Sequence, residues 1–401
     1  MAISNLTRRP LRKLAIVLLV QAAIGTAASF LVHSQTSASR QAAPSALPQV
    51  GGEDVLILSR EPTSTGAKPE FLSITLLPGR GMNLLQLTAN LPGKGEVNLL
   101  ESPAVAEAAS LLNGSGQDAF GNLNQSFGAA FLIPFLSRIS GEVSSDGKTV
   151  TTSWRGKPIT LPNDFLGKYA LHGLVNQARA TDLKTVSTAD GQTATGIIHA
   201  GDFDGHWLSK TDLYFVIELS GSKVDVTVTA NNVGGVIEPM AIGWHPYLSI
   251  PSRDRSQARI HIPAATVARL DDKDGLTTGD LDPVAGTSRD FNAAEGRVLD
   301  ESLNNNFSHL TRTNGVVNSW LADPKSNYAI RVEGLSPHIY TIHVYSPKNG
   351  SFAAIEEQFN FQDPFGKEWR GMETGMAPLK PGESVTWKVR LEMFQPTAVD
   401  H

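Results

Sequence analysis

The stretch from Val224 to Ala230 reads Val-Asp-Val-Thr-Val-Thr-Ala, with apolar and polar side chains in strict alternation. Successive side chains of a β-strand point to opposite faces, so this stretch predicts a strand with one face in the core. Asn231-Asn232 follows it, and such a pair is typical of a turn. The same pattern of short runs between turn residues recurs along most of the chain, and it decides the fold class.

The other strand candidates are short runs rich in β-branched and aromatic residues. They cover residues 71–77, 84–89, 213–219, 259–262, 328–332, 340–345, 352–355 and 385–393. One helix is expected over residues 104–112, with Ser102 as its N-cap and Asn113-Gly114 at its end. So many strands with almost no helices between them predict an all-β fold, a large antiparallel sandwich, rather than a parallel sheet.

Length and composition bound the function. The chain has 401 residues and a formal net charge of −5, and its 41% hydrophobic content excludes intrinsic disorder. Since there is no cysteine, disulfides, Cys-ligated zinc and a thiol nucleophile are excluded. The acidic balance argues against a nucleic-acid partner, which would need a basic face to meet the phosphates.

Residues 1–32 have the character of a targeting segment. Arg8, Arg9, Arg12 and Lys13 precede a weakly polar run over residues 14–32, in which small residues follow the most apolar part. This pattern is typical of a cleaved export signal, and Arg8-Arg9 weakly resembles a twin-arginine signal. The run is also just long enough for an uncleaved membrane anchor. We therefore expect a periplasmic or cell-envelope protein that contacts the membrane only through this segment, if the segment is retained.

The remaining chain divides into two parts. Residues 33–54 are rich in Ser, Ala, Gln and Pro and predict a linker. Residues 55–401 show no shift in composition and predict one domain. The four cations named above are the only charges in residues 1–32, so removal of that segment changes the net charge from −5 to −9.

Familiar nucleotide and metal motifs are missing from the sequence. It contains no Walker loop, no Gly-x-Ser-x-Gly elbow, no His-Glu-x-x-His and no histidine pair at metal-ligand spacing. The sequence therefore gives no sign of a phosphate-binding loop, and we expect no metal site.

Three short segments could carry acid–base chemistry. In Gly243-Trp244-His245-Pro246-Tyr247, the proline limits the backbone around an imidazole, whose ordinary pKa of about 6.5 suits proton transfer. Leu171-His172-Gly173 offers a second histidine. Either histidine could equally be structural, His245 in a core turn and His172 in an exposed loop.

The third segment is Ile355-Glu356-Glu357-Gln358, at the end of an apolar run. Neighbours in a strand point to opposite faces, so at most one of the two acids enters a given pocket. Alternation alone does not decide which one, and a solvated acidic strand end is the alternative.

Taken together and in this order, these segments resemble the aldose 1-epimerase (mutarotase) family, over about residues 131–391. The order of the Leu-His-Gly element, the His-Pro-Tyr element and the late glutamate is the most specific part. The other matching segments are 134–139, 154–157, 161–163, 303–307, 343–346 and Asp363.

The resemblance implies a galactose mutarotase-like β-supersandwich that interconverts the α and β anomers of a free aldose without a cofactor. Carried over by motif, Glu356 is the base and His245 the acid. Arg138 and His172 bind the sugar oxygens, and Asn304 and His343 fall at sugar-binding positions. A glutamate near its ordinary pKa is ionised at neutral pH, and a histidine held protonated can donate. The partner is a small sugar, and the protein is expected to be a monomer or a homodimer.

Four positions depart from the family pattern. Ser137 replaces an Asn, Asn304 an Asp, His343 a Gln, and Glu357 a Pro or Thr. The changes at Ser137 and Asn304 keep a second hypothesis open, a non-catalytic carbohydrate-binding protein on the same fold. A sugar-phosphate epimerase would need more cations than Arg138, and a lyase or hydrolase would need a further acid or a Tyr/Arg pair.

Overall fold

The computed structural model describes residues 47–62 and 68–396. The predicted export signal or anchor, residues 1–32, lies outside the described residues, as does the first part of the predicted linker. Residues 47–54 of that linker are described, and Val50 is buried there in a small cluster with Leu77 and Leu85. Within the described ranges, no helix is long and apolar enough to cross a membrane.

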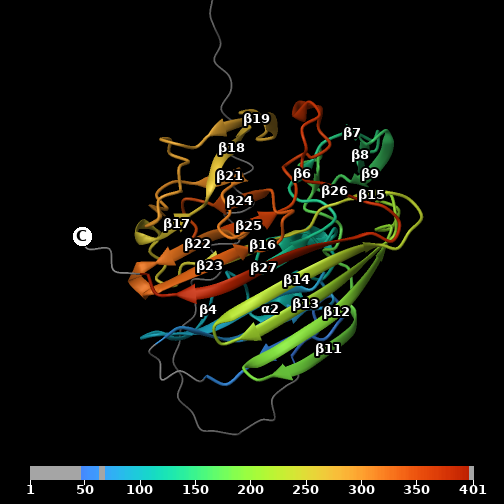
Figure 1. The fold of residues 1–401 in the computed structure, drawn as a ribbon. Helices are drawn as coiled ribbons and strands as arrows, with labels where there is room; N and C mark the ends of the chain where they lie inside the picture. The colour runs from blue at the N-terminus through green and yellow to red at the C-terminus, as the bar shows by residue number, and fades with distance from the viewer. Residues whose placement is uncertain (1–46, 63–67, 397–401) are drawn as a thin grey trace, which may run out of the picture. The chain divides into compact units, whose positions relative to one another are not determined.

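Two large antiparallel sheets make up most of the fold (Figure 1). The first has eleven strands, in the spatial order β1 (Leu56–Ser59), β2 (Glu70–Leu77), β3 (Asn83–Leu91), β5 (Ala129–Leu132), β16 (Gly243–Ser249), β25 (Phe352–Gln358), β24 (Thr341–Ser346), β21 (Leu303–Leu310), β18 (Ala264–Leu270) and β19 (Thr277–Pro283), with β4 (Gly95–Asn98) beside β3. The second has nine, in the order β11 (Thr181–Thr188), β12 (Gly191–Gly201), β13 (Thr211–Ser220), β14 (Lys223–Asn232), β27 (Ser384–Phe394), β23 (Tyr328–Gly334), β22 (Val317–Asp323), β17 (Arg259–His261) and β20 (Arg297–Val298).

Smaller elements complete the described structure. They are the pairs β6 (Arg138–Ile139) with β10 (Ala170–Leu171) and β15 (Glu238–Met240) with β26 (Ala377–Leu379), the ribbon β7 (Glu142–Val143), β8 (Thr149–Trp154) and β9 (Lys157–Pro162), the helix α2 (Val105–Leu111), and the 3₁₀ turns η1 (Gly116–Asp118), η2 (Asn122–Gln125), η3 (Arg255–Gln257), η4 (Pro324–Ser326) and η5 (Lys367–Trp369). The predicted N-cap of the helix is wrong. Ala104 occupies that position without a side-chain hydrogen bond, while Ser102 accepts a hydrogen bond from Asn98 at 2.9 Å.

The two sheets pack face to face through aromatic side chains. The Trp387 ring on β27 lies edge-on to Phe131 of β5 and Trp244 of β16, with ring centroids 6.2 and 5.6 Å apart. All three side chains are almost completely buried. Edge-to-face aromatic pairs of this kind stabilise a core beyond the area they bury. The predicted antiparallel sandwich is confirmed.

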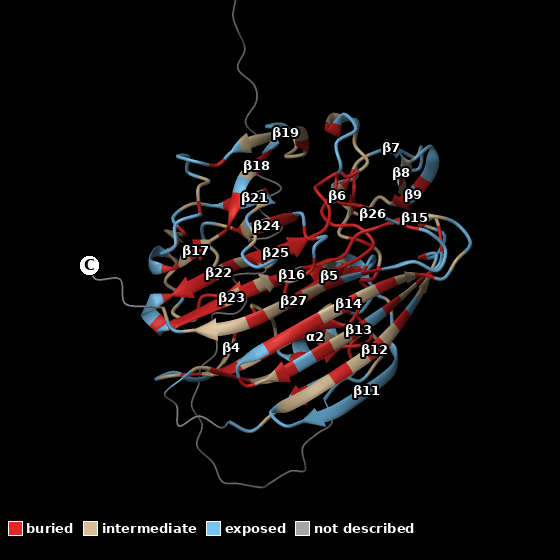
Figure 2. Cartoon of the chain, viewed as in Figure 1, coloured by how far each residue is buried: buried red, intermediate tan, exposed pale blue. Residues whose placement is uncertain are grey.

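The sequence pattern predicts strand β14 but not strand β16. On β14, Val224, Val226 and Val228 are fully buried and alternate with more polar residues, as predicted. On β16, every residue is buried (Figure 2). On one face Trp244 packs against Trp387 of the second sheet, and on the other Tyr247 reaches Gln125. A strand covered on both faces shows no alternation, so the segment around His245 did not stand out as a strand.

One of the two outer strands of the second sheet, β11, is irregular. All eight residues of β11 are exposed (Figure 2). Its register with β12 shifts between Thr181 and Lys184, where Asp182 has a φ of 51°. The edge of this sheet is therefore bent rather than straight.

Candidate functional site

His245 projects from β16, one of the central strands of the first sheet. Its ring is buried and stacks on Tyr247, two residues along the same strand, with ring centroids 4.6 Å apart. The Tyr247 hydroxyl donates a hydrogen bond to the Gln125 carbonyl at 2.9 Å. The stacked tyrosine thus holds the imidazole plane in one orientation.

Glu356 lies on the neighbouring strand β25 and faces this imidazole. Its Oε1 atom is 3.4 Å from His245 Nε2, and its side chain is fully buried. Gln358 donates a hydrogen bond to the other oxygen, Oε2, at 2.7 Å. The amide therefore fixes the carboxyl group so that Oε1 is directed to the histidine.

Burial controls the protonation of this pair. It lowers the pKa of His245 to about 4. Burial also raises the pKa of Glu356 well above its ordinary range; the Gln358 hydrogen bond opposes this rise and the nearby Glu357 adds to it. Both shifts favour an uncharged pair, because a low-dielectric surrounding disfavours each charged form. An ionised glutamate beside a protonated histidine, as expected from ordinary pKa values, is not the favoured state of the free site.

Glu357 points to the opposite side of β25. Its Oε1 accepts a hydrogen bond from Ser319 of β22 at 2.6 Å, which places it between the two sheets. It is fully buried, and burial raises its pKa to about 8. The two neighbouring acids thus enter different surroundings, and only Glu356 meets His245. Neither is a solvated strand end.

His172 follows β10 and reaches the same place. Its ring centroid is 5.4 Å from that of His245, with the rings nearly perpendicular. Its Nδ1 accepts a hydrogen bond from the Ser137 main-chain N–H at 3.2 Å. The main-chain N–H of His172 donates in turn to the Ser137 carbonyl at 2.9 Å. Burial lowers its pKa well below the ordinary value, and nearby His245, His343 and Arg138 add to this. The neutral ring therefore carries its proton on Nε2.

Arg138 lies on β6, which pairs with β10, and its guanidinium is held from two sides. Its Nη1 donates a hydrogen bond to the Asp274 carbonyl at 2.7 Å, from the turn that joins β18 to β19. The rings of Phe165 and Tyr169 lie 5.7 and 5.6 Å from its central carbon. These contacts orient the side chain rather than neutralise it.

His343 and Asn304 continue the site across the first sheet. His343 of β24 is the register partner of Glu356, and its Nε2 is 3.0 Å from Asn304 Oδ1 on β21. Burial, together with the nearby His245 and Arg138, lowers the pKa of His343 to about 3. A neutral His343 that donates from Nε2 fixes the Asn304 amide, with its NH₂ group directed away from the histidine.

The six residues predicted for the site therefore lie together. The side chains of His245, Glu356, His343 and Asn304 follow one another across the adjacent strands β16, β25, β24 and β21. Among the described residues, no group of three or more His, Asp or Glu side chains is arranged to hold a metal ion.

Sequence reasoning missed the groups that hold these six in place. Gln358 had a visible signal, because it lies two residues after Glu356 and so on the same face of the strand. Phe165, Tyr169 and Asp274 had none, since they approach Arg138 only through the tertiary structure.

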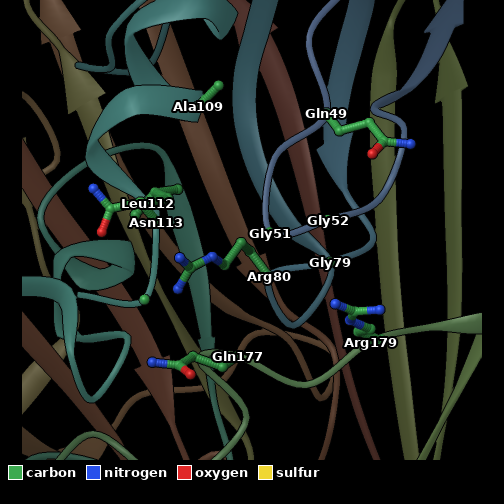
Figure 3. Close-up of a pocket in the computed structure, with 11 residues that line it drawn as sticks. Gln49, Gly51, Gly52, Gly79, Arg80, Ala109, Leu112, Asn113, Gln177 and Arg179 are labelled. Atoms are coloured by element: carbon green, nitrogen blue, oxygen red, sulfur yellow. The ribbon is translucent and has the colours of Figure 1, made fainter.

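A separate polar pocket of about 370 Å³ lies elsewhere in the fold (Figure 3). Its lining consists of Gln49, Gly51, Gly52, Gly79, Arg80, Ala109, Leu112, Asn113, Gly114, Gln177 and Arg179. Arg80 forms a buried ion pair with Asp118 at 2.5 Å. The lining contains no histidine and no carboxylic acid, so this pocket lacks the acid–base pair found between β16 and β25.

Comparison with known proteins agrees with the fold. The sequence matches the family described as Aldose 1-epimerase over residues 101–392. No curated protein sequence matches the chain.

Solved structures of low sequence identity share the architecture. A galactose mutarotase-like protein from Clostridium acetobutylicum is 18% identical with a TM-score of 0.65, over 85% of this chain and 99% of that one. The GalM/aldose epimerase homologue from C. elegans is 17% identical with a TM-score of 0.61, over 81% and 96%. Galactose 1-epimerase from Lactobacillus acidophilus is 15% identical with a TM-score of 0.59, over 86% and 99%.

Proposed function

Because this chain belongs to the aldose 1-epimerase family, we propose that it interconverts the α and β anomers of a free aldose. The observation that carries the proposal is the distance of 3.4 Å between His245 Nε2 and Glu356 Oε1. The two oxygens of a hemiacetal are bonded to the same carbon, C1. An acid and a base that act on them at the same time must therefore be close neighbours, as these two atoms are.

The proposed reaction moves two protons and breaks one bond. Glu356 removes the proton from the C1 hydroxyl, the C1–O bond to the ring oxygen breaks, and His245 protonates that oxygen. The result is the open-chain aldehyde. After rotation about the C1–C2 bond, His245 takes the proton back from the hydroxyl while it attacks C1, and Glu356 returns a proton to the new C1 hydroxyl. The sum is a change of configuration with no net proton transfer.

The protonation states fit a cycle of this kind. The ring-opening step starts from ionised Glu356 and protonated His245, and it ends with the uncharged pair. Burial favours the uncharged pair in the free protein. This is the protonation state from which the ring-closure step starts. The hydroxyl of a bound sugar donates a hydrogen bond to Glu356, and its ring oxygen accepts one from His245. These two hydrogen bonds offset the loss of solvation and so stabilise the charged pair.

Of the other four residues, three are proposed to bind the sugar and the fourth to position one of them. His172 and Asn304 present N–H donors with fixed orientation, Arg138 presents a cation, and His343 holds Asn304 in place. Preorganised donors of this kind position the reacting carbon before any chemistry takes place.

We also propose that the protein is exported, on the pattern of residues 1–32 alone. N-terminal sequencing of the protein from the envelope fraction of its native cells is then expected to begin after about residue 28. An intact N-terminus would favour a membrane anchor instead.

Polarimetry tests the activity. Freshly dissolved α-D-glucose, α-D-galactose and further free aldoses are followed with the full-length chain against a buffer blank, since mutarotation also occurs spontaneously. We expect acceleration that is lost in His245→Asn and kept in His199→Asn, an exposed histidine paired with Asp212. Sugar binding without any acceleration would instead support the non-catalytic alternative.

A further inference from the structure

Arg138 is a half-buried cation without an ionic partner. Among the residues that the structure describes, no carboxylate lies within ion-pairing distance of its guanidinium. The two nearby acids are engaged elsewhere, since Asp274 accepts from the Tyr169 hydroxyl at 2.8 Å and Asp363 from the Ser140 N–H at 3.0 Å. Burial lowers the pKa of Arg138, and the more distant charges of Tyr169, Asp274 and Asp363 oppose this shift without cancelling it.

One edge of this guanidinium is available to a ligand. Only Nη1 is used, in the hydrogen bond to the Asp274 carbonyl. Next to Nη2 lies Gly275, with a φ of +70°, where an added Cβ would come within 3.4 Å of that nitrogen. Gly275 thus places no side chain against Nη2, and among the described residues Nε and Nη2 form no hydrogen bond. This edge has the geometry that binds a carboxylate with two parallel hydrogen bonds.

The neighbouring groups are also donors. His172 presents Nε2–H, because its Nδ1 already accepts from Ser137. Asn304 presents its NH₂ group, because its Oδ1 already lies against His343. Apart from the reacting pair, the site therefore offers a cation and N–H groups, which suit a ligand rich in acceptor oxygens.

We propose that the substrate is an aldose whose terminal carbon is a carboxylate, a hexuronate, with that carboxylate bound by the free edge of Arg138. The inference rests on the proposed function and names its substrate class. A single guanidinium matches a planar carboxylate of one negative charge. A sugar phosphate carries about two and calls for additional cations.

The positions of the side chains agree with this choice. The ring oxygen, which is assigned to His245, is bonded to C5, and C5 carries the carboxylate carbon. The His172 ring contacts His245, and Arg138 is the register partner of Leu171, the residue before His172. A pyranose with C1 at Glu356 and its ring oxygen at His245 therefore has its acid group two bonds from the atom at His245, and Arg138 follows next to His172 on the paired strand.

Matched pairs of sugars test the proposal. D-Galacturonate with D-galactose, and D-glucuronate with D-glucose, differ only at the terminal carbon. The rate is measured by NMR, as magnetisation exchange between the H1 signals of the α and β anomers. The full-length chain is used at pH 7.5, and the spontaneous rate is subtracted. We expect kcat/KM to be at least about tenfold higher for each acid, as one charge-assisted bidentate pair provides.

Variants assign the preference to Arg138. In Arg138→Gln we expect kcat/KM on the acids to fall by on the order of 100-fold and the preference over the hexoses to fall toward one. Arg138→Lys keeps the positive charge but not the two parallel N–H donors of the guanidinium, so it should retain part of the preference for the acids. The control is Arg179→Gln, at the separate pocket (Figure 3), which should leave the ratio unchanged.

The outcomes separate the inference from the activity. Equal kcat/KM for an acid and its hexose would overturn the proposed substrate class but not the epimerase activity. A higher kcat/KM for D-glucose 6-phosphate than for the acids would do the same. Calorimetry with Glu356→Gln measures binding without turnover. Arg138-dependent binding of the acids, with no acceleration of any sugar by the unmodified chain, would uphold the ligand class and overturn the activity. Neither acceleration nor binding of any of these sugars would overturn both.

Discussion

Glu356 and Glu357 share a strand and a chemical type, yet their surroundings separate them. Oε1 of Glu356 faces His245, and Oε1 of Glu357 accepts from Ser319 in the gap between the sheets. A glutamine in place of either acid keeps its size and one acceptor oxygen but cannot take up a proton. The exchange thus tests proton transfer with little change in packing.

We expect Glu356→Gln to lower kcat by on the order of 10²–10⁴-fold, which is the usual contribution of a positioned acid or base. Glu357→Gln should leave kcat unchanged, because its side chain does not reach the histidine. The catalysed rate of anomer exchange, measured for both variants side by side, checks the assignment. Loss of activity in Glu357→Gln alone would mean that the opposite face of β25 carries the chemistry.

At the scale of the element, the approach of β16 to its neighbours sets the distance between acid and base. Gly243 begins β16, and a Cβ added there would lie 2.2 Å from Leu136 Cδ2 and 3.2 Å from the Glu357 carbonyl oxygen. That carbonyl already accepts a hydrogen bond from the Trp387 indole at 2.9 Å. A side chain at Gly243 would therefore force the buried Leu136 to move and crowd β16 against β25.

Gly243→Ala is expected to destabilise the fold by about 1–3 kcal/mol, as overpacking of a tight core does. It should also reduce kcat, since His245 lies two residues farther along the strand. Gly235→Ala is the matched control, because its added Cβ would meet nothing within 4 Å. Urea unfolding and the exchange assay check both variants, and a Gly243→Ala protein with full stability and activity would contradict this account.

The strands differ in how far the sequence predicts them. Strand β14 was predicted because one of its faces is buried more deeply than the other, whereas β16 was not, because both of its faces are covered. The motif around His245, Glu356 and His172 identified residues that do lie together. The contact between Arg138 and Asp274 joins positions 136 residues apart, and no local pattern predicts such a pairing.

For the molecule as a whole, buried acids make stability depend on pH. Glu238 is fully buried against Thr211, and burial raises its pKa from 4.5 to about 8, as it does for Glu357. The folded state then holds a proton that the unfolded state releases. Such a group stabilises the fold fully below about pH 4.5, and this contribution is lost as the pH rises through about 8.

Between pH 6.5 and about 8 we therefore expect Tm to fall, with about 1.4 kcal/mol lost per pH unit for each such acid, and to level off above that pH as both states become ionised. The buried histidines, whose pKa values are lowered, act in the opposite sense only below about pH 6.5. Calorimetric scans across this range should show a smaller fall for Glu238→Gln. Glu218→Gln, an exposed position on β13, should behave like the unmodified chain. An identical fall in all three proteins would contradict the prediction.

The bend in β11 bears on how the protein behaves in a crowded solution. A straight outer strand is a template on which another chain can add a strand of its own, and repeated addition leads to fibres. Here the shift between Thr181 and Lys184 interrupts the row of main-chain donors and acceptors. At the end of the other sheet, β19 carries Asp280 and Asp282 in ion pairs with Arg269 and finishes at Pro283. These two outer strands, β11 and β19, thus resist the addition of a strand from another chain.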